Sequence, residues 1–253
     1  MIGLARLTLA ETRGRLLLVG AAGLLFLAGA TLTSATAGGG ADPGMDEVFR
    51  LGGYPLVSAV LLMGWTVGRF PLFAAVVLCA AVGMGGQRGG WARLAHARPL
   101  APWRIYLLRW ALLAGIAFGV SALVLPLFDL LILGTWAGPP TLVLAAAAVL
   151  AYGSLAALAS AWLPRDAALG VAAILAVGAH VWHAALRSGA ADAVPRGVGR
   201  FLSFVLPPQG ALYALEGAFV GVEPIPWASF AYVAGYAALV GALALLSLTL
   251  REV

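Results

Sequence analysis

"GGQRGGWARLAHARPLAPWRIYLLRWALLAGIAFGVSALVLPLFDLLIL", residues 85–133, joins an arginine-rich stretch directly to a long apolar run. The apolar run exceeds the roughly 20 residues that a helix needs to cross a bilayer. The whole chain has the same character, since 62% of its 253 residues are hydrophobic, 10% are charged and its mean hydropathy is +1.00. Too few polar residues remain to cover a soluble domain, so the sequence predicts an integral membrane protein.

Six apolar segments predict an all-α, polytopic fold with six transmembrane helices in a single domain, residues 1–253. Each segment supplies about 20 residues. The expected spans are residues 16–34, 70–86, 106–133, 140–163, 167–186 and 227–248. Before the first span, "LARLTLAETRGR" at residues 4–15 has the pattern of an amphipathic helix that lies on the inner membrane surface.

The beginning of the chain also has the outline of a secretory signal. Basic residues precede an apolar run, and the small residues Ala35, Thr36 and Ala37 follow it. The run is longer than the apolar part of a usual signal, so we favour an uncleaved first span, with cleavage as the alternative.

Arg69 and Pro71 interrupt the apolar stretch that begins at Tyr54. An arginine at the middle of the bilayer costs at least about 2.5 kcal/mol on insertion scales. We therefore place Arg69 at the outer end of the second span, where its side chain reaches the interface and has no buried partner. Residues 54–67 are then an interfacial or re-entrant lead-in.

The distribution of arginine predicts the orientation. Basic residues concentrate before the first span and after the second and fourth, at Arg6, Arg13, Arg15, the cluster within residues 87–104, and Arg165. By the positive-inside rule both termini and the loop 87–104 are cytoplasmic, and the loop 187–226 lies outside. The net charge of +5 thus sets orientation, and no nucleic-acid partner is expected. All 15 basic residues are arginine, which is typical of a GC-rich bacterial genome and indicates the bacterial cytoplasmic (inner) membrane.

Motifs for catalysis are missing from the sequence. Without lysine the chain has no GxxxxGK[ST] phosphate-binding loop, and HExxH is also absent. We expect no enzyme activity of its own, no metal and no cofactor. His180 and His183 share one face of the fifth span, but two nitrogens without a carboxylate or thiolate make an incomplete metal site. We interpret them as interfacial histidines near the outer end of that span.

Other polar and small residues have ordinary interpretations. Asp129 is expected to reach headgroups and water at the outer end of the third span, and Glu216 to be solvated in the outer loop. Cys79 is expected to be a small buried hydrophobe. Gly115 and Gly119 form a GxxxG motif, which supports close helix contact either within the chain or between two copies.

The arginine-rich loop contains a candidate short helix, "GGWARLAHAR" at residues 89–98. Trp91 and Leu94 share one apolar face of about two turns, and Pro99 ends the helix. The loop either anchors the chain to anionic lipid or contacts a protein, and composition leaves both open.

The order of these features resembles the permease subunits of the type 2 export family of ATP-binding-cassette transporters. That family commonly shows "E-R-x-x-G-T-x-x-x-L-L-x-x-P-x-S-R" after the second span, then "G-K". Gln87 and Arg88 stand at the acidic-basic pair here, Pro99 at the proline, Arg104 at the following basic residue and Arg109 at the lysine. "LPP" at residues 206–208 is similar to the outer-loop proline motif of the family. Gln87 departs from the usual glutamate, and Trp91 stands near the usual threonine.

The resemblance implies an exporter permease without local catalysis. A separate ATPase subunit would bind ATP and dock on a short cytoplasmic coupling helix, and a second permease copy would complete a homodimer or heterodimer. The implied coupling residues are Gln87, Arg88, Trp91, Arg93, Leu94, Arg98, Pro99, Trp103, Arg104 and Arg109. The sequence does not identify the substrate.

Two other function classes remain as alternatives. An ion- or proton-coupled secondary transporter ordinarily places ionisable residues in the middle of the membrane, and few are expected there once Arg69 is at the interface. An intramembrane enzyme needs a convergent nucleophile, base or metal set, which the sequence does not reveal.

Overall fold

The computed structural model describes residues 2–36, 48–51, 54–58, 69–83, 101–136, 138–220 and 224–250. These residues form eight α-helices, one 3-10 helix and a two-stranded antiparallel hairpin, so the described chain is essentially all-α. The α-helices are α1 (Ile2–Thr36), α3 (Arg69–Cys79), α5 (Pro102–Leu133), α6 (Pro139–Trp162), α7 (Arg165–Ser188), α8 (Arg196–Val205), α9 (Gln209–Val220) and α10 (Trp227–Leu250). The 3-10 helix is η1 (Ala190–Ala193), and the strands are β1 (Val48–Leu51) and β2 (Tyr54–Ser58).

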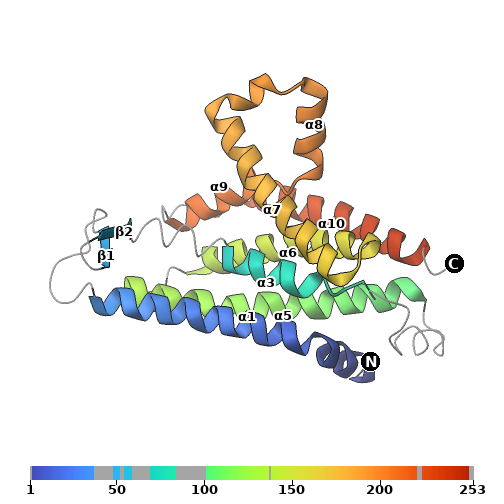
Figure 1. The fold of residues 1–253 in the computed structure, drawn as a ribbon, viewed down its shortest axis with the longest axis horizontal. Coiled ribbons are helices and arrows are strands. Elements are labelled where there is room, and N and C mark those ends of the chain that lie inside the picture. Colours follow the sequence, from blue (N-terminus) through green and yellow to red (C-terminus); the bar gives the residue numbers. More distant parts are fainter. Residues whose placement is uncertain are drawn as a thin grey trace.

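An elongated bundle of α1, α3, α5, α6 and α10 forms the body of the protein (Figure 1). Helix α6 is at its centre and contacts α3, α5, α7, α9 and α10. Small residues permit this close approach: a Cβ atom added at Gly153 of α6 would lie 3.2 Å from the Sγ atom of Cys79. Cys79 is completely buried, which confirms its expected role as a small core residue.

Among the described residues, five helices are long and apolar enough to cross a membrane, so the chain is a polytopic membrane protein by helix length and composition. They are Ala5–Gly29, Trp103–Leu131, Pro139–Trp162, Asp166–Ser188 and Trp227–Leu250. The expected second span differs. Helix α3 has 11 residues, or about 16 Å at 1.5 Å per residue, which is roughly half of the hydrocarbon thickness. It is apolar on nearly all sides because it lies in the core of the bundle, with Ala74, Ala75 and Leu78 fully buried.

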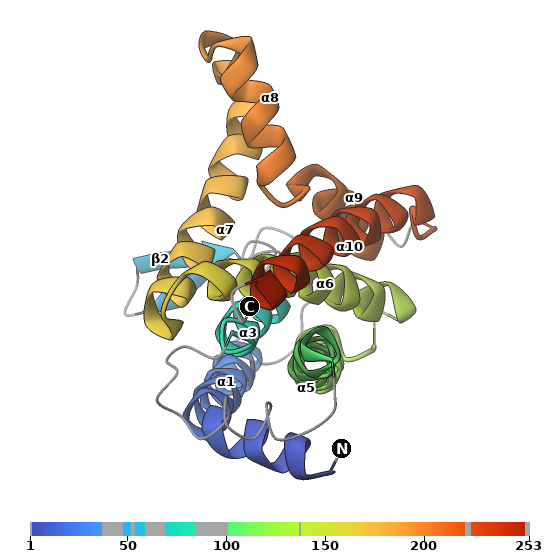
Figure 2. The same ribbon diagram turned by 90° about the vertical axis from the view of Figure 1, so that its right-hand side faces the viewer.

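The expected separation between a surface helix and the first span is absent, because α1 is one continuous helix from Ile2 to Thr36. Figure 2 shows its first turns running at an angle to the remainder. Thr8 and Thr12 on these turns are fully buried. Helix α1 contacts α5, so part of its polar face contacts protein instead of a membrane surface.

The expected outer loop, residues 187–226, contains η1, α8 and α9. Helix α7 leaves the bundle at a steep angle, and α8 runs back toward it (Figure 1). Helix α9 then lies against α6 and α10. The lead-in at residues 54–67 begins as a strand, because β2 pairs with β1 through Leu51 and Tyr54; residues 59–68 lie outside the described part.

The two chain segments that flank residues 84–100, the end of α3 and the start of α5, lie at the same end of the bundle. Arg15 of α1 contacts Val77 near the end of α3, and Glu11 of α1 contacts Arg109 near the start of α5. Figure 1 places both chain termini at this end too. We call it the loop end. The topology prediction requires these segments to share one side of a membrane, and which side they face stays a prediction.

Candidate functional site

The loop end carries the sequence-predicted coupling residues that fall within the described chain. Trp103 and Arg104 lie on the first turn of α5 and are exposed. The Arg104 guanidinium carbon is 5.2 Å from the centre of the Trp103 ring, a cation–π arrangement. Seven of the coupling residues lie outside the described residues, so the coupling helix stays a prediction: Gln87, Arg88, Trp91, Arg93, Leu94, Arg98 and Pro99.

Arg109 differs from the other predicted coupling residues, because its side chain is buried inside the chain. Its Nη2 atom donates a hydrogen bond to Oε2 of Glu11 at 2.8 Å. The early turns of α1 cover this part of α5, and a guanidinium shielded from water needs a counter-charge. Arg109 therefore joins α5 to α1, whereas direct docking of a partner needs an accessible side chain.

Gly83 fixes the other flank of residues 84–100. Its N–H donates to Oγ of Ser160 at 2.9 Å, at the end of α6. A Cβ atom at position 83 would lie 2.1 Å from the Ser160 carbonyl oxygen, so the contact requires glycine. Nearby, Nη1 of Arg15 donates to the carbonyl oxygen of Val77 at 2.9 Å. Both flanks of residues 84–100 are thus attached to other helices.

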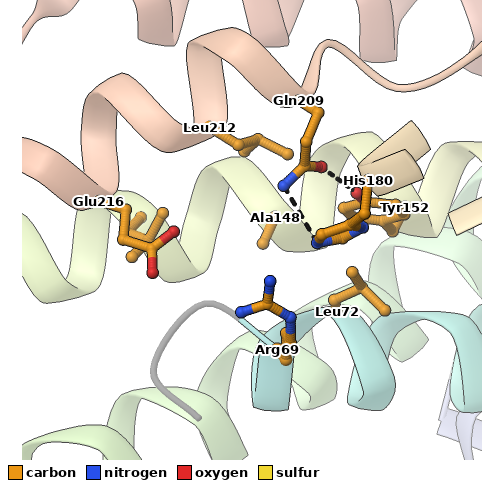
Figure 3. A pocket seen from close by; sticks show the side chains of 9 residues that line it. Arg69, Leu72, Ala148, Tyr152, His180, Gln209, Leu212 and Glu216 are labelled. Atoms are coloured by element: carbon orange, nitrogen blue, oxygen red, sulfur yellow. Dashed lines mark hydrogen bonds between the residues drawn. The ribbon is translucent and has the colours of Figure 1, made fainter. Parts of the chain in front are cut away.

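A second polar region is a pocket between α3, α6, α7 and α9 (Figure 3). Its lining is Arg69, Leu72, Leu144, Ala148, Tyr152, His180, Gln209, Leu212 and Glu216. The guanidinium of Arg69, the first residue of α3, points into this pocket. Its Nη2 atom donates to the hydroxyl of Tyr213 at 3.3 Å.

The expectation that Arg69 has no buried partner is therefore wrong. Arg69 shares the pocket with Ala148, which is nine residues into α6 and so about 13 Å from the start of that helix at 1.5 Å per residue. Helix α9, which follows η1 and α8 in the chain, brings Tyr213 and Glu216 to Arg69. A linear hydropathy pattern does not contain this long-range contact.

The amide of Gln209 bridges Tyr152 and His180. The Tyr152 hydroxyl donates to Oε1 of Gln209, and Nε2 of Gln209 donates to Nε2 of His180 at 3.1 Å. Nδ1 of His180 lies 2.8 Å from the carbonyl oxygen of Ala176. A carbonyl oxygen only accepts, so Nδ1 carries the proton and the imidazole is the neutral Nδ1–H tautomer.

The two histidines thus have a different environment from the one expected. His180 faces inward to the pocket instead of the interface, and the His183 ring stacks on Tyr213 with centroids 4.9 Å apart. No group of three His, Cys, Asp or Glu residues able to hold a metal occurs within the described residues. The histidines belong to a hydrogen-bonded and aromatic cluster that α9 completes.

Glu216 is half-buried on α9, which is not one of the candidate spans, so the expectation of a solvated carboxylate is wrong. Burial raises the pKa of the Glu216 carboxyl above its usual value, and the Arg69 guanidinium lowers it by less. The pocket therefore contains one basic and one acidic side chain from helices far apart in the sequence.

Two further expectations concern residues of α5, namely Asp129 and the GxxxG motif. Asp129 is fully buried, and Oγ1 of Thr141 donates to its Oδ2 atom at 3.3 Å, so it does not reach headgroups. Helix α6 begins a few residues after α5 and covers Asp129.

The space beside Gly115 and Gly119 is open, because a Cβ atom added at either glycine would meet nothing within 4 Å. The GxxxG motif is therefore not used for close contact among the described residues.

Sequence reasoning did not select Tyr152, Gln209 or Tyr213. Gln209 offered a usable signal, since it is a polar residue directly after Pro207 and Pro208 and before an apolar helix. The tyrosines carried none, because an isolated tyrosine in an apolar helix is ordinary.

No protein-family model matches the chain, and no curated protein and no solved structure matches it significantly. The class of polytopic membrane protein rests on the length and composition of its helices.

Proposed function

We propose that the chain is the permease subunit of an ATP-binding-cassette exporter, which moves a substrate across the bacterial cytoplasmic membrane when a separate ATPase subunit hydrolyses ATP. The resemblance of residues 87–109 and 206–208 to that family supports this proposal. The observation that carries it is mechanical: both flanks of the predicted coupling loop are fastened to different helices.

A docking loop transmits force only if its ends are held. At one flank the hydrogen bond between Gly83 and Ser160 attaches the loop to α6. At the other the ion pair between Arg109 and Glu11 attaches it to α1. Helix α6 contacts α7 and α9, which line the pocket. A movement of the loop would therefore be transmitted to the pocket through α6. Such transmission is what a transporter that alternates between two states requires.

The proposal includes two protein partners. The ATPase docks on the loop, and exposed Trp103 and Arg104 extend that surface onto α5. A second permease copy packs on the open face of α5 at Gly115 and Gly119, where nothing within the described chain approaches. ATP is bound by the ATPase, and we propose no catalytic or cofactor-binding residue in this chain.

The proposal predicts that a gene for an ATPase subunit lies beside this one, and the test is coexpression of the two proteins. Replacement of Trp91 and Leu94 by alanine is expected to weaken copurification, since apolar anchors at such contacts are worth about 1 to 4 kcal/mol each. Replacement of Arg93 and Arg98 is expected mainly to change the salt dependence of association. Membrane levels, measured by blotting, are expected to stay at the parent level. A Trp91 and Leu94 variant that binds the ATPase and stimulates ATP hydrolysis like the parent contradicts the proposal.

The pocket favours a second candidate, an ion- or proton-coupled transporter. Arg69, His180 and Glu216 are ionisable and meet between helices, which is typical of coupling sites in such proteins. Reconstitution of the chain alone in vesicles separates the two candidates. Uptake driven by a proton or sodium gradient without ATPase favours this candidate, and uptake that needs both ATPase and ATP favours the exporter.

A further inference from the structure

We infer that the side-chain amide of Gln209 is a two-position switch that is set by a proton on His180. In the position that the structure shows, the amide nitrogen donates to a neutral imidazole. When the imidazole takes up a proton from water, the amide turns over and its oxygen accepts from the imidazolium. The inference concerns proton binding by this chain, so it goes beyond the exporter proposal and does not depend on it.

Three hydrogen bonds run in one direction from α6 through α9 to α7 (Figure 3). The Tyr152 hydroxyl donates to Oε1 of Gln209, and Nε2 of Gln209 donates to Nε2 of His180. Nδ1–H of His180 then donates to the carbonyl oxygen of Ala176. Tyr152 and Gln209 are buried, so bulk water does not replace these bonds. The neutral imidazole, which accepts at Nε2, therefore fixes the direction of the whole chain of bonds.

A proton on Nε2 of His180 reverses the bond to Gln209. An imidazolium donates from both nitrogens, so a donor then faces the amide nitrogen, which is also a donor. Rotation of the amide by half a turn exchanges its oxygen and nitrogen at almost no change in shape. Oε1 of Gln209 then accepts from His180, and the amide nitrogen donates to the phenol oxygen of Tyr152, which accepts as well as donates. Both positions of the amide therefore keep α6, α7 and α9 connected.

The pocket provides a partner for the hydrogen that Tyr152 no longer gives to Gln209. Tyr152 lines the pocket, and the free space there is about 10 Å³, which is room for about one water molecule. A water in this space accepts from the Tyr152 hydroxyl when the amide has turned. The space is too small for a solute, so its size suits a switch that exchanges only protons and water.

The titratable groups that face His180 come from each helix packed around it: Arg69 on α3, Tyr152 on α6, His183 on α7, and Tyr213 and Glu216 on α9. Arg69 opposes a positive imidazole, whereas an ionised Glu216 favours one. These two charges offset each other. The hydrogen bond to Gln209 is therefore the contact that distinguishes the two protonation states, because a bond from an imidazolium is charge-assisted.

The first experiment follows the imidazole nitrogens of His180 by ¹⁵N NMR in the purified chain in detergent. The chain has three histidines, so His96→Gln and His183→Gln leave His180 as the single labelled residue. At pH 8 we expect a proton on Nδ1 and none on Nε2. On acidification we expect protons on both nitrogens. A proton on Nε2 alone at pH 8 overturns the inference, and so does an imidazole that stays neutral down to pH 4.

Variants of Gln209 test whether the amide follows the proton. Gln209→Met keeps the length of the side chain but has no acceptor oxygen, so charging His180 is expected to need a proton concentration about tenfold higher. Gln209→Glu offers a carboxylate that accepts from the imidazolium, and about tenfold fewer protons are expected to suffice. Ser203→Ala removes a hydrogen bond to Trp182 outside the pocket and is the control that leaves the titration unchanged.

A Gln209→Met variant that takes up the proton at the same concentration as the parent overturns the inference. If Gln209→Met does not fold, Gln209→Glu decides, and a titration equal to that of the parent then overturns it. Neither measurement involves the ATPase or transport. Failure of the inference is therefore distinct from failure of the proposed function.

Discussion

The Nη2 atom of Arg109 on α5 lies 2.8 Å from Oε2 of Glu11 on α1. The Arg109 side chain is fully buried, and that of Glu11 is 22% exposed. Loss of hydration offsets much of the attraction in such a pair, so its presence alone adds little stability. Removal of one partner is costly, however, because it leaves a charge inside the protein. The pair therefore fixes the position of α1 against α5 at the loop end.

Glu11→Ala is expected to lower the free energy of unfolding by about 3 kcal/mol, because Arg109 then loses its counter-charge. Glu11→Ala combined with Arg109→Leu is expected to recover most of this loss, since no buried charge remains. Thermal unfolding in detergent is the measurement. Arg13→Ala, at an exposed position of α1, serves as the control and is expected to have little effect. Strictly additive losses in the double variant contradict the role assigned to the pair.

Gly83→Ala is expected to cost about 1 to 3 kcal/mol, the range for overpacking at a close contact. The new Cβ would lie 2.1 Å from the Ser160 carbonyl oxygen, so α3 must move away from α6. The unfolding midpoint measures this effect. Gly115→Ala is the matched control, because its Cβ meets nothing within 4 Å. Unchanged stability in Gly83→Ala would show that this junction is loose.

Apolar length was enough to predict most long helices. The runs around Tyr106 to Leu133 and Trp227 to Leu248 correspond to α5 and α10, because about 20 consecutive apolar residues fit few structures other than a spanning helix. The same reasoning predicted a second span, residues 70–86, that is longer than the helix α3, Arg69–Cys79. Helix α3 is apolar because protein surrounds it, and hydropathy does not distinguish burial in protein from burial in lipid.

Polar residues were predicted less well, since their partners are distant in the sequence. Arg69 contacts Tyr213, which is 144 residues away, and Arg109 contacts Glu11, which is 98 residues away. Each arginine was interpreted from its neighbours in the chain alone. Asp129 was likewise interpreted from its position near the end of an apolar run, whereas it is buried and accepts a hydrogen bond from Thr141 at the start of α6.

Arg69→Leu is expected to destabilise the protein by about 1 to 3 kcal/mol, the usual cost of leaving buried polar groups without a hydrogen-bond partner. Tyr213 loses its donor, and Glu216 loses the nearby positive charge. The yield of folded protein and its unfolding midpoint in detergent report the effect. Arg187→Leu, at an exposed position of α7, is the control. If both variants resemble the parent, Arg69 is a solvated interfacial residue after all.

The stability of the protein is expected to fall as pH rises from 4.5, the ordinary pKa of a glutamate, through the higher pKa of folded Glu216. In this window the folded state holds a proton that the unfolded state has lost, so unfolding becomes more favourable with rising pH. Glu216→Gln stays neutral and is expected to lose this part of the dependence. Unfolding midpoints of both proteins across pH 4 to 8 are the measurement, with Asp192→Asn as the control. Parallel pH profiles for the parent and Glu216→Gln contradict the assignment.

The open glycine face of α5 predicts a dimer contact. Gly115 is exposed, and a Cβ at Gly115 or Gly119 meets nothing, so a larger side chain fits the isolated fold. Leu107 and Leu123, eight residues before and after Gly115 on α5, are also exposed. Gly115→Leu is expected to reduce the dimer fraction without lowering the unfolding midpoint, because it blocks close backbone approach between copies. Crosslinking in membranes and light scattering in detergent measure the dimer fraction.

Gly235→Leu on α10 is the matched control, because Gly235 is also exposed and a Cβ atom added there has no neighbour within 4 Å. A Gly115→Leu variant that dimerises like the parent, or a parent that is monomeric in both measurements, excludes a homodimer built on this face.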